Sequence, residues 1–209
     1  MKNALVIEVQ TCQLDAGKGT GGGNFPMEQL GKPDIRLHGQ VDDAMLDLFI
    51  AQLDAVREKQ GPVLVEITTL GGDAEIGERI AENIRIAQEY FGMDMYLLGV
   101  TTVYSAGITI MSAFSAQKRF LSKSTTLLIH ERRMDHSLQL TGPLRICEAL
   151  AQDALAEIRT SQRLQNETFE RLMRGSDLSA EAVLQQVAKA DWYLPATEAV
   201  RLKLVAGLI

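Results

Sequence analysis

Ser105 stands where an apolar, strand-like stretch gives way to a helix-like one, in the sequence VTTVYSAGITIMSAF (100–114). A serine hydroxyl is a poor nucleophile until a base takes its proton and hydrogen-bond donors stabilise the oxyanion that forms. The unpaired N–H groups at the start of a helix provide part of that stabilisation. The nucleophile-elbow pattern GxSxG is half present, because Gly107 fits it and Val103 replaces its first glycine. A serine that only caps the helix is the alternative interpretation.

Two glycines, Gly71 and Gly72, mark a second strand-to-helix turn in the sequence ITTLGGDAEIG, one strand earlier in the chain. In a parallel sheet, turns of this kind lie at the same edge, where the carboxyl ends of the strands meet. We therefore expect the backbone N–H groups of Gly72 and Ala106 to converge on one oxygen atom. The alternative is that the glycines only permit a tight turn.

His130 ends the apolar, strand-like sequence TTLLIH and is predicted to lie at that same edge of the sheet. The other two histidines, His38 and His136, lie in polar surroundings. A histidine that acts as general base needs an orienting carboxylate. Asp191 is a candidate, because it stands between two predicted helices beside a Trp-Tyr-Leu run that could bury it. A structural histidine and a turn aspartate are the alternative interpretations.

Alternating elements along the first 130 residues must position these side chains. The patterns predict strands at 4–9, 34–41, 63–68, 95–103, near 118–122 and at 125–130, and helices at about 42–60, 74–91 and 105–117. Such alternation is typical of an α/β fold with parallel strands and right-handed crossovers. Later in the chain helical patterns dominate, at about 142–174, 179–190 and from residue 196.

The segment from Met95 to Gln117 carries no charged residue, which raises the question of a membrane span. It divides into a strand of about seven residues and a helix of about twelve, each too short to cross a bilayer. Its many Gly, Ser and Thr residues are unlike the composition of a lone span. A helix that is apolar on all sides is typical of a buried core.

Composition excludes several function classes. The chain has 209 residues, of which 46% are hydrophobic and 23% charged, the balance of a soluble globular protein. A net charge of -6 without any basic run argues against nucleic acid and membrane surfaces as partners. Cys12 and Cys147 form no CxxC pattern, so neither a disulfide framework nor a zinc site is predicted. The N-terminal MKNALVIEVQ has too short an apolar core for a signal peptide, and we expect a cytoplasmic protein.

Four successive blocks of the sequence resemble the proteolytic subunit of the Clp protease. The order and spacing of the blocks match that family over roughly residues 34–209, and they read DIRLHGQVDD, VEITTLGGDAEIG, VTTVYSAGITIMSAFSAQKRFLSKSTTLLIH and ADWYLPATEAVRLKLVAGLI. The resemblance implies one peptidase domain, 1–209, with a crotonase-like spiral of βαβ units. It also implies a protruding handle helix in a region of about 131–175, C-terminal helices, and a divergent Gly-rich N-terminal segment at 1–33.

By the same resemblance, Ser105 is the nucleophile, His130 the general base and Asp191 the residue that orients the base. The N–H groups of Gly72 and Ala106 form the oxyanion hole. The resemblance implies a serine endopeptidase that needs no metal or cofactor. It further implies that this peptidase acts on peptides or unfolded proteins inside a homo-oligomeric ring or stacked rings, with a Clp-type ATPase as a possible partner.

The sequence departs from the family near these residues. Glu131-Arg132 follows the histidine in place of Gln-Pro, and Ala190 replaces an arginine before the aspartate. Glu66 replaces an aromatic residue that helps to dock the ATPase, and the segment between the histidine and the aspartate is longer than usual. Two alternatives stay open. A crotonase-type acyl-CoA enzyme would use the same fold and paired N–H groups, and a catalytically inactive assembly subunit would tolerate these departures.

Overall fold

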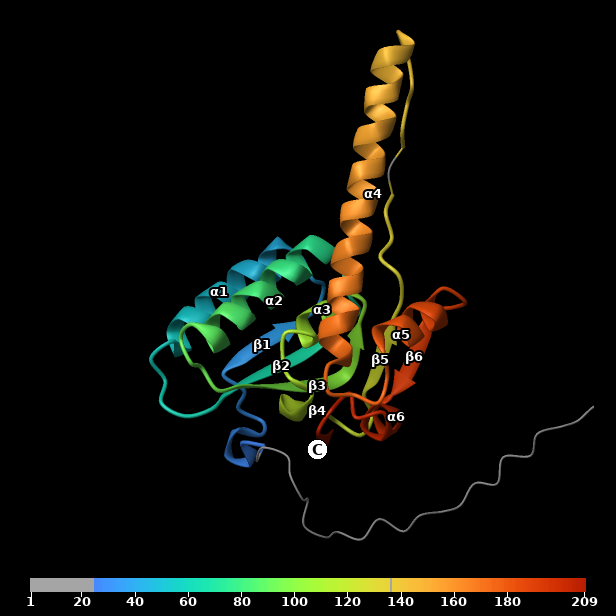
Figure 1. The fold of residues 1–209 in the computed structure, drawn as a ribbon. Helices are drawn as coiled ribbons and strands as arrows, with labels where there is room; N and C mark the ends of the chain where they lie inside the picture. The colour runs from blue at the N-terminus through green and yellow to red at the C-terminus, as the bar shows by residue number, and fades with distance from the viewer. Residues whose placement is uncertain (1–24, 136) are drawn as a thin grey trace, which may run out of the picture.

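Parallel strands form the centre of the protein, as the alternating sequence pattern predicts (Figure 1). The computed structural model describes residues 25–135 and 137–209. The first four strands pair in parallel and in chain order: β1 (Ile35–His38), β2 (Val63–Thr69), β3 (Met95–Tyr104) and β4 (Arg119–Leu121). Two further parallel pairs join β5 (Thr126–Ile129) to β3 and β7 (Gly207–Leu208) to β4.

The helices predicted between and after these strands are also present. Their bounds are α1 (Asp43–Val56), α2 (Ala74–Glu89), α3 (Ala106–Met111), α4 (Leu144–Met173), α5 (Ala180–Val187) and α6 (Ala196–Arg201), with short 3-10 helices η1 (Met27–Gln29) and η2 (Ala116–Lys118). Helices α1 and α2 lie side by side over the sheet, whereas α4 projects far from the body (Figure 1).

Several sequence predictions need correction. The helix predicted at 105–117 is shorter, because α3 ends at Met111, and the Ser112 hydroxyl donates to the Thr109 carbonyl at 2.7 Å. Strand β6 (Trp192–Pro195), which pairs antiparallel with β5, was not predicted, because four residues are too few to display an alternating pattern. The two-residue β7 was missed for the same reason, and the helix predicted from residue 196 ends at Arg201. The predicted strand at 4–9 lies outside the described residues.

Aspartate caps start the two helices that cover the sheet. The Asp42 carboxylate accepts a hydrogen bond from the Met45 N–H at 2.9 Å, at the start of α1. The Asp73 carboxylate accepts from the N–H groups of Glu75 and Ile76 at 2.7 and 3.0 Å, at the start of α2. Because Asp73 directly follows the glycine turn, this cap fixes where α2 leaves the sheet edge.

Helix α3 is buried, as its uniformly apolar sequence predicts. Five of its six residues are buried, and they are Ala106, Gly107, Ile108, Ile110 and Met111. The uncharged segment that contains it is therefore core. In the part of the chain that the structure describes, no helix combines the length and apolarity required to cross a membrane.

A bend in β3 divides this strand between two partners. Its first half pairs with β4 through Gly99, and its second half pairs with β5 from Thr102 onward. At the bend the register with β2 passes from Ile67–Gly99 to Thr69–Val103, so that β3 carries extra residues there. A Cβ atom added at Gly99 would lie 2.6 Å from a methyl carbon of Leu121, so the bend needs glycine at this position.

Arg119 anchors the base of α4 from inside the core. It is fully buried, and its guanidinium donates to four backbone carbonyls, those of Phe114, Leu172, Leu204 and Arg171, at 2.8, 2.7, 3.2 and 3.4 Å. Two of these carbonyls lie in the last turn of α4, where the helix dipole favours a cation. Burial lowers the pKa of Arg119 to about 9, so the side chain keeps its charge at neutral pH.

Arg119→Met is expected to lower the free energy of unfolding by about 3 kcal/mol, because it leaves buried carbonyls without donors. Lys118→Met is the matched control. Lys118 pairs with Asp94 on the surface, with the two side chains 33% and 49% exposed, so we expect a change of about 0.5 kcal/mol or less. Urea unfolding followed by circular dichroism measures both. Equal losses in the two variants would contradict the anchoring role.

Candidate active site

Ser105 lies on the turn between β3 and α3 with a strained backbone. Its φ of 55° and ψ of -115° are outside the regions that side-chain-bearing residues usually occupy. Its N–H group donates to the Leu128 carbonyl at 3.0 Å, which ties the turn to β5. The hydroxyl makes no capping hydrogen bond to α3, so a simple helix cap does not describe this serine. Strain of this kind is held by the surrounding structure and is common at active sites.

Gly71 packs directly against Ser105 and allows the two turns to approach closely. A Cβ atom added at Gly71 would lie 2.6 Å from the Cβ atom of Ser105. A Cβ atom at Gly72 would lie 2.3 Å from the Val41 carbonyl oxygen. Both glycines have positive φ angles, of 102° and 150°. Glycine is therefore required here for close approach as well as for the turn.

Two backbone N–H groups beside Ser105 have no acceptor within the described part of the chain, those of Gly72 and Ala106. The backbone around Gly72 is otherwise paired, because Val41 N–H donates to the Gly71 carbonyl and Asp73 N–H donates to the Val41 carbonyl. Both residues with unpaired N–H groups line the same cavity as Ser105. Unpaired donors that open into a cavity can stabilise a negative charge that develops there.

His130 directly follows β5 and is half-buried. Its Nδ1 atom lies 2.5 Å from the carbonyl oxygen of Glu131. Because a carbonyl can only accept, Nδ1–H donates this hydrogen bond, and in the neutral imidazole Nε2 is then the nitrogen that can act as a general base. Among the described residues, no hydrogen bond joins His130 to Ser105.

Asp191 directly precedes β6, as His130 directly follows β5. The antiparallel register of β5 and β6 runs to the pair Ile129–Trp192. The next pair in that register is His130 with Asp191. Directly opposite residues of antiparallel strands have their side chains on the same face, with Cβ atoms about 4.5–5.5 Å apart. Pairing of β6 with β5 therefore places Asp191 at the same end of the sheet as His130.

The Asp191 carboxylate, however, contacts an arginine. Arg133 Nη2 donates to Asp191 Oδ2 at 2.8 Å and to Oδ1 at 3.1 Å. The Asp191 side chain is 38% exposed, so the expectation that flanking residues bury it is wrong. The reason is that β6 pairs only with β5 among the described strands, so this edge of the sheet faces solvent. The flanking residues do not cover the carboxylate, because Trp192 is only half-buried and Tyr193 is exposed.

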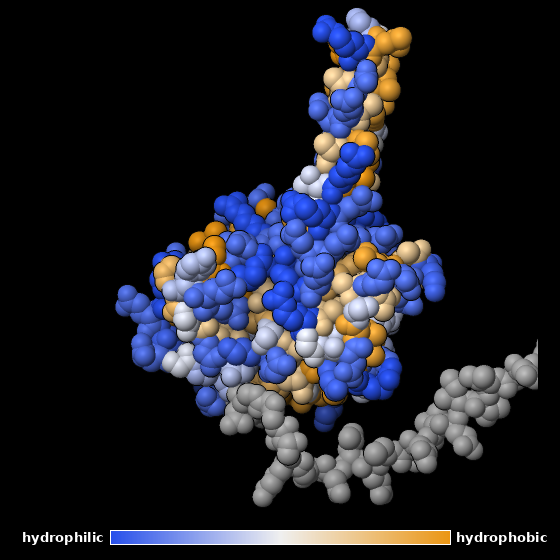
Figure 2. All heavy atoms as spheres, viewed as in Figure 1, coloured by the Kyte–Doolittle hydropathy of each residue, from blue (hydrophilic) through white to orange (hydrophobic). Residues whose placement is uncertain are grey.

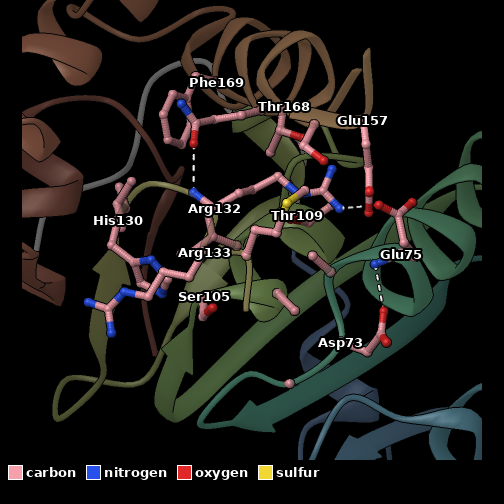
Figure 3. Close-up of a pocket in the computed structure, with 18 residues that line it drawn as sticks. Asp73, Glu75, Ser105, Thr109, His130, Arg132, Arg133, Glu157, Thr168 and Phe169 are labelled. Atoms are coloured by element: carbon pink, nitrogen blue, oxygen red, sulfur yellow. Dashed lines mark hydrogen bonds and ion pairs between the residues drawn. The ribbon is translucent and has the colours of Figure 1, made fainter. Parts of the chain in front are cut away.

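A cavity of about 570 Å³ opens in front of Ser105 (Figure 3). Four of the five predicted site residues line it, namely Gly72, Ser105, Ala106 and His130. The buried C-terminal part of α4 closes another side with Gln165, Thr168 and Phe169. Asp191 is not among the residues that line this cavity.

Two cavity-lining arginines, Arg132 and Arg133, were not identified as site residues from the sequence. Arg132 spans the cavity, because its N–H group donates to Gln165 Oε1 at 2.6 Å and its guanidinium donates to Glu75 Oε1 at 2.7 Å (Figure 3). The available signal was the Arg132-Arg133 pair, two and three residues after the histidine, because Arg132 departs from the family pattern.

The groups gathered at this edge are those of acyl transfer. They comprise a strained serine, an imidazole whose Nδ1–H donates to a backbone carbonyl, and two N–H donors. No cluster of three or more His, Cys, Asp or Glu side chains suited to a metal ion occurs in the residues 25–135 and 137–209.

Comparisons with known proteins show which family the chain belongs to. The sequence matches the Clp protease family over residues 26–209. It is 23% identical over 177 residues to the ATP-dependent Clp protease proteolytic subunit 2 of Treponema pallidum, covering 84% of this chain and 81% of that protein.

The structure is similar to that of a point mutant of ClpP1 from Listeria monocytogenes, with a TM-score of 0.63, 20% sequence identity, and coverage of 84% of this chain and 90% of that chain. This likeness confirms the predicted crotonase-like ClpP fold. Because the family match covers most of its length, the chain belongs to the Clp protease family and is a serine peptidase.

Proposed function

We propose that this chain is a serine endopeptidase in which Ser105, His130 and Asp191 form a catalytic triad. The N–H groups of Gly72 and Ala106 form its oxyanion hole. Its substrates are peptides or unfolded proteins, cleaved inside a chamber that copies of this chain enclose as rings. The observation that carries the proposal is the strained turn of Ser105, held against the glycine turn beside two N–H groups without acceptors in the described residues.

The mechanism follows from the positions of these groups. His130 Nε2 takes the proton of Ser105 as its Oγ atom attacks the peptide carbonyl carbon. The oxyanion that forms accepts hydrogen bonds from Gly72 and Ala106. Collapse of the tetrahedral intermediate leaves an acyl-enzyme and expels the amine, which receives the proton from His130. Water activated by the same imidazole then hydrolyses the ester, while Asp191 orients Nδ1–H and stabilises the imidazolium.

Helix α4 supports the ring part of the proposal. Only its C-terminal part is buried against the body, and the rest projects into solvent (Figure 1). Apolar side chains lie exposed along the projecting part, namely Leu144, Ile146, Leu150, Leu155 and Ile158 (Figure 2). An exposed apolar surface of this kind marks a protein–protein contact. A second copy of this chain is the partner that family membership favours.

A Clp-type ATPase that feeds the chamber is a further part of the proposal, supported by family membership and by the name of the Treponema relative. Glu66 on β2 stands where the family has an aromatic docking residue, and it pairs with His38 on β1 at 2.8 Å. An ATPase loop that docks on this face would meet a polar, hydrogen-bonded pair in place of an aromatic ring.

Fluorophosphonate labelling tests the nucleophile. We expect one label per wild-type subunit, on Ser105, because a serine activated by a base displaces fluoride from the probe. Ser105→Ala should abolish labelling, and His130→Ala should slow it by about 10²-fold or more. Ser115→Ala, which changes an exposed serine of the same segment, is the control and should label like wild type. Rings of wild-type protein that never label would instead indicate an assembly subunit.

The contact between the two turns can be tested with Gly71→Ala. The added methyl group would collide with the Ser105 side chain and displace it, which is expected to slow labelling and hydrolysis of a fluorogenic peptide by about 10²-fold. Gly61→Ala is the matched control, because Gly61 has a similar φ of 93° and no atom within 4 Å of an added Cβ. Equal losses of activity in both variants would show that backbone strain alone is responsible.

The apolar surface of α4 can be tested with Ile158→Glu. A charge on this surface is expected to reduce the assembled mass in solution at a given protein concentration, because it opposes burial against a second copy. Thr160→Glu places the same charge on an exposed residue at a helical angle about 160° away, and should leave the mass unchanged. Light scattering coupled to size-exclusion chromatography measures the mass. Wild-type protein that stays a single subunit would contradict the ring.

A further inference from the structure

The two arginines that follow His130 are held in different ways. The Arg132 side chain is only 19% exposed and its guanidinium is fixed by Glu75 across the cavity. The Arg133 side chain is 73% exposed and pairs with both carboxylate oxygens of Asp191. The more exposed arginine thus occupies the carboxylate that stands opposite the histidine in the β5–β6 register.

We propose that Arg133 is a positioning residue of the active site, which holds Asp191 away from the Nδ1–H group of His130. The inference rests on the proposed function, because it takes Asp191 as the orienting carboxylate. In the structure, Nδ1–H donates to the Glu131 carbonyl instead. A neutral carbonyl stabilises an imidazolium less than a carboxylate does, because hydrogen bonds between charged partners are the stronger ones. Arg133 therefore sets the fraction of sites in which the triad is complete.

The Arg133–Asp191 pair is a solvent-exposed ion pair, which another hydrogen-bond donor can displace easily. Exposed ion pairs contribute little, because water screens the charges and long side chains lose conformational freedom. The competing contact is a hydrogen bond from His130 Nδ1–H to the Asp191 carboxylate, and it gains strength when His130 becomes an imidazolium during the reaction. Screening by salt weakens the exposed pair further, so ionic strength shifts the balance toward the histidine.

Labelling rates with the fluorophosphonate probe test the inference on the full-length protein. Arg133→Gln is expected to raise the rate constant by about two- to fivefold, the range that an exposed pair can account for. In the Asp191→Asn background, Arg133→Gln should leave the labelling rate constant unchanged, because residue 191 then has no carboxylate for which Arg133 and His130 could compete. Raising the salt concentration to about 0.5 M should raise the wild-type rate relative to Arg133→Gln.

Arg163→Gln is the matched control for the loss of an arginine charge. Arg163 pairs with Glu167 on α4, outside the cavity, and the two side chains are 62% and 41% exposed. This variant should label at the wild-type rate. An unchanged or lower rate in Arg133→Gln, or the same gain in the Asp191→Asn background, would overturn the positioning role.

A second measurement separates this inference from the proposed function. The chain has three histidines, so selective ¹⁵N-histidine labelling allows the Nδ1 proton of His130 to be assigned by NMR. In Arg133→Gln the resonance of this proton is expected to move to lower field, because its acceptor changes from a carbonyl to a carboxylate. In the double variant Arg133→Gln with Asp191→Asn, no such shift is expected. A shift without labelling in any variant would refute the peptidase and uphold the positioning role. If wild type is labelled but Arg133→Gln shows neither a faster rate nor a shift, the peptidase is upheld and the positioning role is refuted.

Discussion

The bend of β3 is the constraint on which the site depends. Before the bend, β3 lies against β4 and belongs to the central sheet. Beyond it, the strand lies against β5, and the Ser105 N–H group donates a hydrogen bond to the Leu128 carbonyl of β5. His130 directly follows that strand. Without a change of partner at Gly99, the serine and the histidine would follow strands that are not neighbours. Glycine at the bend permits it, because Leu121 and Val103 fill the space of a side chain.

The far wall of the cavity depends on how α4 is fixed. Arg119 holds the last turn of this helix from the core, and Arg171 in the same turn pairs with Glu78 of α2 at 2.8 and 2.9 Å. Burial lowers the pKa of Arg171, an effect that its carboxylate partner Glu78 opposes. The base of α4 is thus joined to the helix that begins at the glycine turn. Both sides of the cavity are positioned by the same small set of buried and half-buried charges.

Long periodic patterns made most of the fold predictable, whereas short elements and charged contacts were not. The parallel strands and α1, α2 and α4 follow from repeated apolar spacing, and the meeting of the two turns follows from the common sheet edge. Strand β6 is too short to show a period, although it places Asp191 opposite His130. The pairing of Asp191 with Arg133 joins two residues that are 58 positions apart in the chain, and no sequence pattern encodes the distance between their side chains. The catalytic roles of these residues stay predictions.

The exposure of Arg133 also has a consequence in time. Side chains that are largely in water change rotamer within picoseconds to nanoseconds, far faster than a peptidase turns over. Exchange of Asp191 between its two partners would therefore reach equilibrium many times before each acylation. The Arg133–Asp191 contact therefore lowers the acylation rate in proportion to the fraction of sites in which it is formed. It adds no slow step, so progress curves should show no lag.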